Sequence, residues 1–152
     1  MAPAPRGAMT TIADELRQRT FRYALRVLSS CRRLPDTLEG REIARQFLRS
    51  GMGTASNYWS ACRGRSGAEF IAKLGVAEDE AAESVMWLML ILQSGIRADA
   101  ETKDLLQEGR EITAILSKSH KTARENRRKS KSKNQLTKLP TYQPANSSEA
   151  LP

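Results

Sequence analysis

Side chains that can do acid–base or metal chemistry are few in this sequence. The densest group of carboxylates consists of Glu78, Asp79, Glu80 and Glu83. Carboxylates on bundle helices hold di-iron centres together with Glu-x-x-His pairs, but no glutamate here has a histidine three residues later. The single histidine, His120, would need a nucleophile and an orienting partner to act as a base, and the sequence identifies neither. We therefore expect no enzymatic activity, no metal site and no cofactor.

Two cysteines, Cys31 and Cys62, are too few for a disulfide framework. Each lies at the end of an expected helix beside arginines, and nearby positive charge lowers the pKa of a thiol. A small buried apolar side chain is the more common role of such a residue. We favour this structural interpretation over a reactive thiol.

The hydropathy of the chain excludes membrane proteins and secreted proteins. The longest apolar run, from Val85 to Leu92, has eight residues, whereas a membrane span needs ~18. The first nine residues contain no apolar stretch of the kind found in a secretory signal. The expected location is the cytoplasm.

Positive charge is the most informative feature of the composition. The chain of 152 residues has 25 Lys and Arg against 17 Asp and Glu, a formal net charge of +8. Residues 1–65 carry 12 basic and 5 acidic side chains, residues 66–126 carry 7 and 11, and residues 127–152 carry 6 and 1. Such asymmetry is typical of proteins that bind a polyanion or associate head to tail.

Two runs of arginine have the spacing of one helical face. One run follows i, i+3, i+7 and the other follows i, i+4, i+8, which places neighbouring side chains about 6 Å apart, within reach of phosphates along a nucleic-acid backbone. Further arginines gather near the turn at residues 63–65. The candidate nucleic-acid-binding residues are Arg19, Arg22, Arg26, Arg41, Arg45, Arg49, Arg63 and Arg65. Alternatively, the second run pairs with the acidic segment that contains Glu78 to Glu83 and serves the fold or self-assembly.

Four helical segments must position these side chains. Apolar residues recur at helical spacing in the segments 11–33, 38–62, 67–94 and 98–126. Pro35 and Gly95 end two of them, and Ser66 with Glu69 has the spacing of a capping box. No strand-like alternation is present. Short turns between helices of similar length predict an all-α fold, an antiparallel up-down-up-down four-helix bundle.

The termini have a different composition from the bundle. Residues 1–10 show no periodicity, and beyond Ser130 large apolar residues are too sparse to offset the cost of ordering the chain. We expect one domain at residues 11–126, a disordered N-terminus at 1–10 and a disordered basic tail at 127–152.

Small residues dominate the segment from Ser50 to Ser56. Gly51 and Gly53 inside a helix each cost ~1 kcal/mol relative to alanine. Either the helix is weak or broken there, or Gly51 and Ala55 let another backbone approach closely. We favour the close approach.

The segment 67–94 is apolar on more faces than the core of a single four-helix bundle can bury. Trp87, Leu90 and Ile91 lie off its main apolar stripe. Together they would form an exposed patch that monomers rarely carry, so they are the candidate residues of an oligomer interface.

A family resemblance rests on the middle of the chain. The matching residues are Asn57-Tyr58, Ala61-Cys62-Arg63, Arg65-Ser66, Ala68 to Leu74, Glu80-Ala81 and Trp87-Leu88. They resemble the four-helix bundle protein family, also called the ribosomal-RNA intervening-sequence protein family, over roughly residues 12–120. Two departures are Gly53-Thr54, where a small residue and Val or Ile are usual, and Asp79, where Lys is common.

The resemblance implies a bacterial antiparallel bundle that assembles into a homopentamer. Family members are encoded inside intervening sequences of large-subunit ribosomal RNA genes. A relative, the accessory variability determinant of diversity-generating retroelements, binds nucleic acid and a reverse transcriptase. We therefore expect a non-catalytic homo-oligomer that associates with RNA or DNA through basic surface, as an accessory to a retroelement reverse transcriptase or to RNA. The alternative is a scaffold whose charge asymmetry serves self-assembly without nucleic acid.

Overall fold

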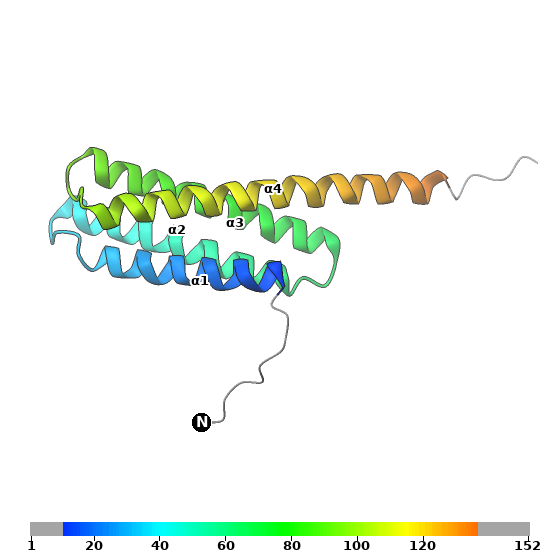
Figure 1. Ribbon diagram of the computed structural model, residues 1–152, viewed down its shortest axis with the longest axis horizontal. Coiled ribbons are helices and arrows are strands. Elements are labelled where there is room, and N and C mark those ends of the chain that lie inside the picture. Colours follow the sequence, from blue (N-terminus) through cyan, green and yellow to red (C-terminus); the bar gives the residue numbers. More distant parts are fainter. Residues whose placement is uncertain (1–10, 137–152) are drawn as a thin grey trace, which may run out of the picture.

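Four helices make up almost all of the described chain. The computed structural model describes residues 11–136. In chain order the helices are α1 (Ile12–Cys31), α2 (Leu38–Cys62), α3 (Gly67–Gln93) and α4 (Ala100–Leu136). Successive helices run in opposite directions (Figure 1). The predicted all-α four-helix bundle is confirmed, and the described residues contain no strand. The expectations for residues 1–10 and 137–152 lie outside the described residues.

Local capping explains where the helices begin. The Thr11 side chain accepts from the Asp14 amide and that of Thr37 from the Gly40 amide, each at 3.1 Å, so both satisfy an orphan donor of a first turn. Ser66 likewise accepts from the third amide of α3 at 3.1 Å. The predicted capping box there is only half formed, because the carboxylate three residues later accepts from the amide of Arg65 at 2.9 Å instead.

The core runs along the bundle axis and draws on all four helices. Its fully buried large side chains include Tyr23, Val27, Phe47, Leu74, Leu88, Ile91, Leu105, Ile112 and Leu116. The bundle therefore has one continuous apolar interior. Helices α1 and α4 pack least closely of the adjacent pairs, and side chains rather than backbone bridge the space between them.

The predicted close approach at Gly51 is confirmed. A Cβ added to this residue would lie 2.6 Å from Val27 Cγ1, so only glycine lets α1 and α2 pack at this separation. Helix α2 is continuous through both glycines, from Leu38 to Cys62, which excludes the broken-helix alternative. The buried Thr54 hydroxyl donates to the Ser50 carbonyl at 2.9 Å, so the polar groups here are satisfied within the helix.

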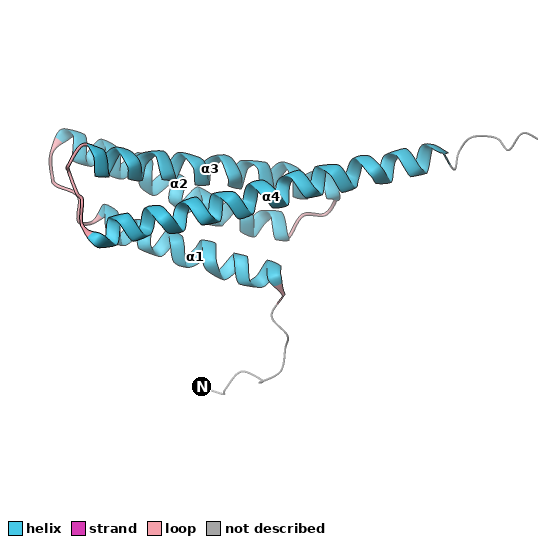
Figure 2. Cartoon of the chain, turned by 45° about the horizontal axis from the view of Figure 1, so that its top comes forward, coloured by secondary structure: helices cyan, strands magenta, loops and turns pink. Residues whose placement is uncertain are grey.

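Helix α4 is longer than expected. The predicted end at Asn126 is wrong, because the helix continues to Leu136, and its last turns project past the loop between α2 and α3 (Figure 1, Figure 2). The expectation rested on the lack of apolar residues. Lys, Arg, Gln and Glu are good helix formers without a core, and no glycine or proline interrupts the chain between Gly109 and Pro140.

Candidate nucleic-acid interface

Arginines of α1 face carboxylates of α4. Arg19 donates to both oxygens of Glu108 at 2.7 and 2.8 Å and to Glu111 at 2.5 Å. The hydrogen bonds to Glu108 raise the pKa of the Arg19 guanidinium above its usual range. The other pairs along this seam are Arg26 with Asp104 at 2.7 Å and Arg33 with Glu101 at 2.5 Å. Arg19 and Arg26 are therefore largely neutralised, and of the predicted α1 residues Arg22 alone has no carboxylate partner within residues 11–136.

The predicted α2 stripe (Arg41, Arg45 and Arg49) lies on the surface but is paired. Its ion pairs are Arg41 with Asp36 at 2.6 Å, Arg45 with Glu42 at 2.6 Å and Arg49 with Glu83 at 3.7 Å. The arginine side chains are 62 to 73 % exposed, so these pairs contribute little to stability. The alternative of pairing with the acidic segment holds for Arg49 alone.

Arg63 and Arg65 stand in and beside the turn between α2 and α3. Both are exposed, and neither side chain has an ion-pair partner in the described part of the chain. The end of the bundle that carries them is also the end from which α4 projects (Figure 1). Their positive charge therefore adds to that of the projecting helix.

The largest group of unpaired cations was missed by sequence reasoning. The basic face of α4 consists of Lys121, Arg124, Arg128 and Lys131, which follow i, i+3, i+7, i+10 and share one side of the helix. No carboxylate among residues 11–136 lies within ion-pair distance of these four side chains. The same spacing was present in the sequence, but we expected the helix to end at Asn126, between Arg124 and Arg128, so the four side chains were not assigned to one helical face.

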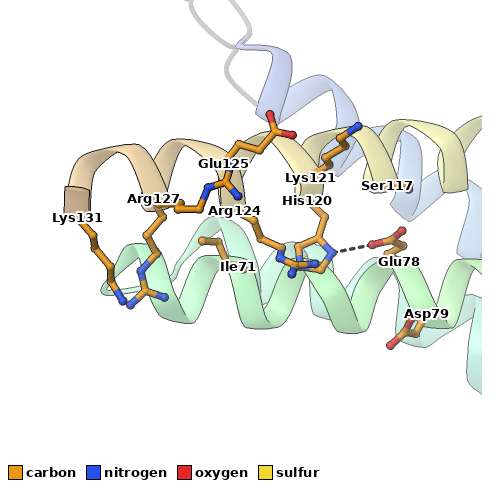
Figure 3. Close-up of a pocket in the computed structure, with 11 residues that line it drawn as sticks. Ile71, Glu78, Asp79, Ser117, His120, Lys121, Arg124, Glu125, Arg127 and Lys131 are labelled. Atoms are coloured by element: carbon orange, nitrogen blue, oxygen red, sulfur yellow. Dashed lines mark hydrogen bonds and ion pairs between the residues drawn. The ribbon is translucent and has the colours of Figure 1, made fainter. Parts of the chain in front are cut away.

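This basic face lines a groove between α3 and α4, the α3–α4 groove, of about 860 Å³ (Figure 3). Ile71, Glu78 and Asp79 line it from α3, and eight α4 residues from Ser117 to Lys131 complete it. Five lining residues are basic and three are acidic. The acidic side chains of α3, Glu78 and Asp79, lie at one end of the groove, here called the inner end, and Lys131 lies at the opposite, outer end (Figure 3). The outer end therefore favours an anion.

Glu78 and His120 meet at the inner end of the α3–α4 groove. The Nδ1 atom of His120 lies 2.7 Å from Oε2 of Glu78, and the two side chains are 21 and 26 % exposed. The imidazole ring packs against the backbone of α3 at Gly75. A Cβ added to this glycine would lie only 3.0 Å from His120 Cε1. Glu78 is thus an orienting partner that the sequence did not reveal, 42 residues away.

The remaining acidic cluster divides among separate contacts. Glu80 packs against Gly53, and burial followed by the charge of Glu83 raises the pKa of the Glu80 carboxyl. Glu83 accepts from the Trp87 indole at 3.2 Å. Within residues 11–136, no group of three or more His, Cys, Asp or Glu side chains is arranged to hold a metal ion.

Burial governs the cysteine at the end of α1. It raises the pKa of the Cys31 thiol to about 11, and the sulfur lies 3.5 Å from the Ala44 carbonyl oxygen. This supports the structural interpretation for Cys31, because a protonated thiol is a poor nucleophile.

Comparisons with known proteins agree with the fold and with the resemblance in the sequence. A family model described as 23S rRNA-intervening sequence protein matches residues 14–118. The chain belongs to this family. A crystal structure of a protein of unknown function from the S23 ribosomal protein family of Bacteroides thetaiotaomicron is similar at a TM-score of 0.65 and 25 % identity, covering 70 % of this chain and 98 % of that one. Among curated proteins none matches. The predicted family is thereby confirmed.

The intervening-sequence protein has a different apolar surface from the one predicted. The prediction that Ile91 lies in an oligomer interface is wrong, because this side chain is 0 % exposed and belongs to the core. Trp87 is partly buried against that core, and of the predicted three only Leu90 is exposed. Periodicity along one helix does not show which apolar positions its neighbours cover.

Exposed apolar side chains of this family member gather instead on α1 and α2. Phe21, Leu25, Met52 and Trp59 are exposed. All but Leu25 line a shallow pocket of about 370 Å³ together with Ala24, Ala55 and Ser56. The Arg17 guanidinium lies 5.1 Å from the centre of the Trp59 ring and covers one edge of this apolar patch. No helix of residues 11–136 is long and apolar enough to cross a membrane.

Proposed function

We propose that this chain binds the sugar-phosphate backbone of nucleic acid in the cytoplasm, without catalysis, through the basic face of α4. The observation that carries the proposal is the contrast in pairing. All arginines of α1 and α2 except Arg22 have carboxylate partners, whereas the four cations of the basic face of α4 have none among the described residues. Unpaired cations on a projecting helix can approach phosphates without first giving up an internal ion pair.

Backbone binding follows from the chemistry of this surface. Lysine and arginine neutralise phosphates and release condensed counterions, a term that is independent of base sequence. The basic face of α4 spans Lys121 to Lys131, about 15 Å at 1.5 Å per residue. It therefore meets a few consecutive phosphates, and Arg63 and Arg65 extend the positive surface at the same end of the bundle.

A matched pair of variants tests the assignment. The first changes Lys121, Arg124, Arg128 and Lys131 to Gln, and the control changes Arg41, Arg45 and Arg49 of the α2 stripe to Gln. Binding of an RNA oligonucleotide is measured by fluorescence anisotropy at several salt concentrations. We expect the first variant to lower the slope of log affinity against log salt by up to about 0.7 for each phosphate of a single strand that it no longer neutralises. The α2 variant should change it less.

The reverse ranking would overturn the assignment to α4. An unchanged slope in both variants, with intact binding, would also contradict it. Equal helix content by circular dichroism establishes that each variant is folded, since all seven side chains are exposed.

We propose further that the chain self-associates, with the pentamer as the stoichiometry that the family resemblance implies. Support comes from Phe21, Leu25, Met52 and Trp59, which a second copy of this chain would cover. Light scattering at micromolar concentration should return a multiple of the 16.9 kDa chain mass. A value near one chain mass would sink self-association and leave the nucleic-acid proposal standing.

The scaffold function is the second candidate, and a specific observation favours it. Arg19 and Arg26 of α1 pair with carboxylates of α4, which supports a role of this part of the basic surface in holding the helices together. A scaffold would self-associate and bind no nucleic acid at any salt concentration. The reverse transcriptase partner stays a prediction of the family resemblance, tested by co-purification of the two proteins.

A further inference from the structure

The inner end of the α3–α4 groove contains a hydrogen-bonding arrangement that phosphate binding alone does not require. Glu78 Oε2 and His120 Nδ1 are 2.7 Å apart. An ionised carboxylate only accepts hydrogen bonds, so Nδ1 carries a proton. In the neutral ring the other nitrogen, Nε2, is then an acceptor. Contact of the ring with Gly75 holds it in this orientation.

The Nε2 atom has no hydrogen-bond donor among the described residues. It makes no hydrogen bond within residues 11–136 and is not one of their buried unpaired polar atoms. His120 lines the α3–α4 groove, as Figure 3 shows. A ligand in the groove therefore meets an accessible acceptor whose proton position is set by Glu78.

The chemistry of nucleic acid limits which donor this is. A phosphodiester oxygen only accepts, so a phosphate does not satisfy the lone pair on Nε2. Arg124 lies one turn beyond His120 on the same face, about 6 Å away, and holds a phosphate in the proposed function. The ribose next to that phosphate carries a 2′-hydroxyl, which donates a hydrogen bond and which deoxyribose lacks.

We propose that the α3–α4 groove selects RNA over DNA, with His120 Nε2 accepting a hydrogen bond from a ribose 2′-hydroxyl and Glu78 fixing the tautomer that accepts it. The proposal rests on nucleic-acid binding through the basic face of α4. The proposal concerns a single strand, whose ribose and phosphate groups are free to enter the groove of about 860 Å³.

Three probes of equal length isolate the 2′-hydroxyl. They are oligouridylate, oligodeoxyuridylate and 2′-fluoro-oligouridylate of about 12 nucleotides. The fluoro probe keeps the ribose pucker and removes the donor. Affinities are measured by fluorescence anisotropy at one mildly alkaline pH of about 8, because a protonated imidazole donates from both nitrogens and accepts at neither. We expect oligouridylate to bind about 2- to 12-fold more tightly than either other probe, the range for one hydrogen bond.

Two variants and a control test the roles of the residues. His120→Phe keeps a ring against Gly75 and removes the acceptor, so all three probes should bind with equal affinity. In Glu78→Gln the amide can donate to Nδ1, the ring proton can move to Nε2, and the RNA preference should fall. Glu125→Gln removes a negative charge from the same groove without contacting His120. It should strengthen the binding of all three probes alike and leave the ratios of their affinities unchanged.

Each outcome decides a different point. Equal binding of the three probes by the native protein, or an RNA preference that survives both His120→Phe and Glu78→Gln, would overturn the selection of RNA while leaving backbone binding intact. If His120→Phe loses its helix content, Glu78→Gln and its charge-matched control decide alone. If none of the probes binds the native protein, nucleic-acid binding itself is overturned.

Discussion

The two halves of α4 carry opposite charge and have opposite roles in the structure. The first half contributes the carboxylates Glu101, Asp104, Glu108 and Glu111, which pair with arginines of α1 and of the turn that follows it. The second half carries the basic face, which has no ion-pair partner in the described chain. One continuous helix thus closes the bundle at one end and presents positive charge at the other. Net charge alone conceals this division, because the two halves partly cancel.

Packing differs between the halves in the same way. A Cβ at Gly109 in the first half would lie 2.7 Å from the Tyr23 hydroxyl, so the Tyr23 side chain of α1 packs directly against the backbone of α4 there. Residues 126–135 of the second half are all exposed. Stability should therefore depend on the first half and ligand affinity on the second.

The largest expected effect is overpacking of the first half. Gly109→Leu should lower the free energy of unfolding by about 1–3 kcal/mol, because the new side chain meets Tyr23, although leucine is the better helix former by nearly 1 kcal/mol. Urea unfolding measures the change. Ser130→Leu in the second half is the control and should leave stability nearly unchanged. A stabilised Gly109→Leu protein would show that Tyr23 does not pack against this position.

Alkaline pH should also act through the first half. Burial raises the pKa of Tyr23 to about 12, and the hydrogen bond with Ser84 opposes this only in part. The folded pKa of Tyr23 exceeds the unfolded value of about 10. The contribution of the neutral Tyr23 side chain to the free energy of unfolding is therefore complete below pH 10 and is lost as pH rises toward 12. The free energy of unfolding of each protein is measured at about pH 9 and about pH 11. Between these two values the native protein should lose about 1 kcal/mol more than the Tyr23→Phe variant loses. Equal losses in urea unfolding would contradict this.

Exchanging one arginine that pairs with the first half of α4 and one that lies in the second half tests the division of roles between them. Breaking the α1–α4 seam by Arg19→Gln should lower the free energy of unfolding by about 1 kcal/mol, since it leaves Glu108 without its bidentate partner. Arg124→Gln should leave stability unchanged and weaken RNA binding. If Arg19→Gln weakens binding instead and leaves stability alone, the division between the halves is wrong.

The smallest effect is expected from truncation. Deleting residues 130–152 should leave the melting temperature nearly unchanged, because residues 130–135 are exposed. A drop of more than a few degrees would show that the second half of α4 contributes to the bundle. RNA affinity of the truncated protein should fall modestly, since Lys131 is removed from the basic face.

The sequence predicted those parts of the structure that depend on local signals. Pro35, Thr37 and Ser66 mark helix boundaries through their own backbone and side-chain chemistry, and the structure places those boundaries within a few residues of the prediction. Gly51 was interpreted correctly because a glycine inside a helix needs a reason.

Long-range contacts account for what the sequence did not predict. Arg19 pairs with a carboxylate 89 residues away, and no spacing rule connects such positions. Ile91 is buried because neighbouring helices cover it, which periodicity in one helix does not show. The length of α4 was underestimated because absence of a core was equated with absence of structure.

The projection of α4 beyond the bundle has a consequence for assemblies of this chain. Each copy would contribute one arm, and a strand long enough to touch two arms would bind the second at high effective concentration. Avidity would then rise in a step once the oligonucleotide reaches the distance between arms, instead of gradually with length. Short fragments would dissociate while long transcripts stay bound, so the assembly would measure the length of its ligand without reading a single base.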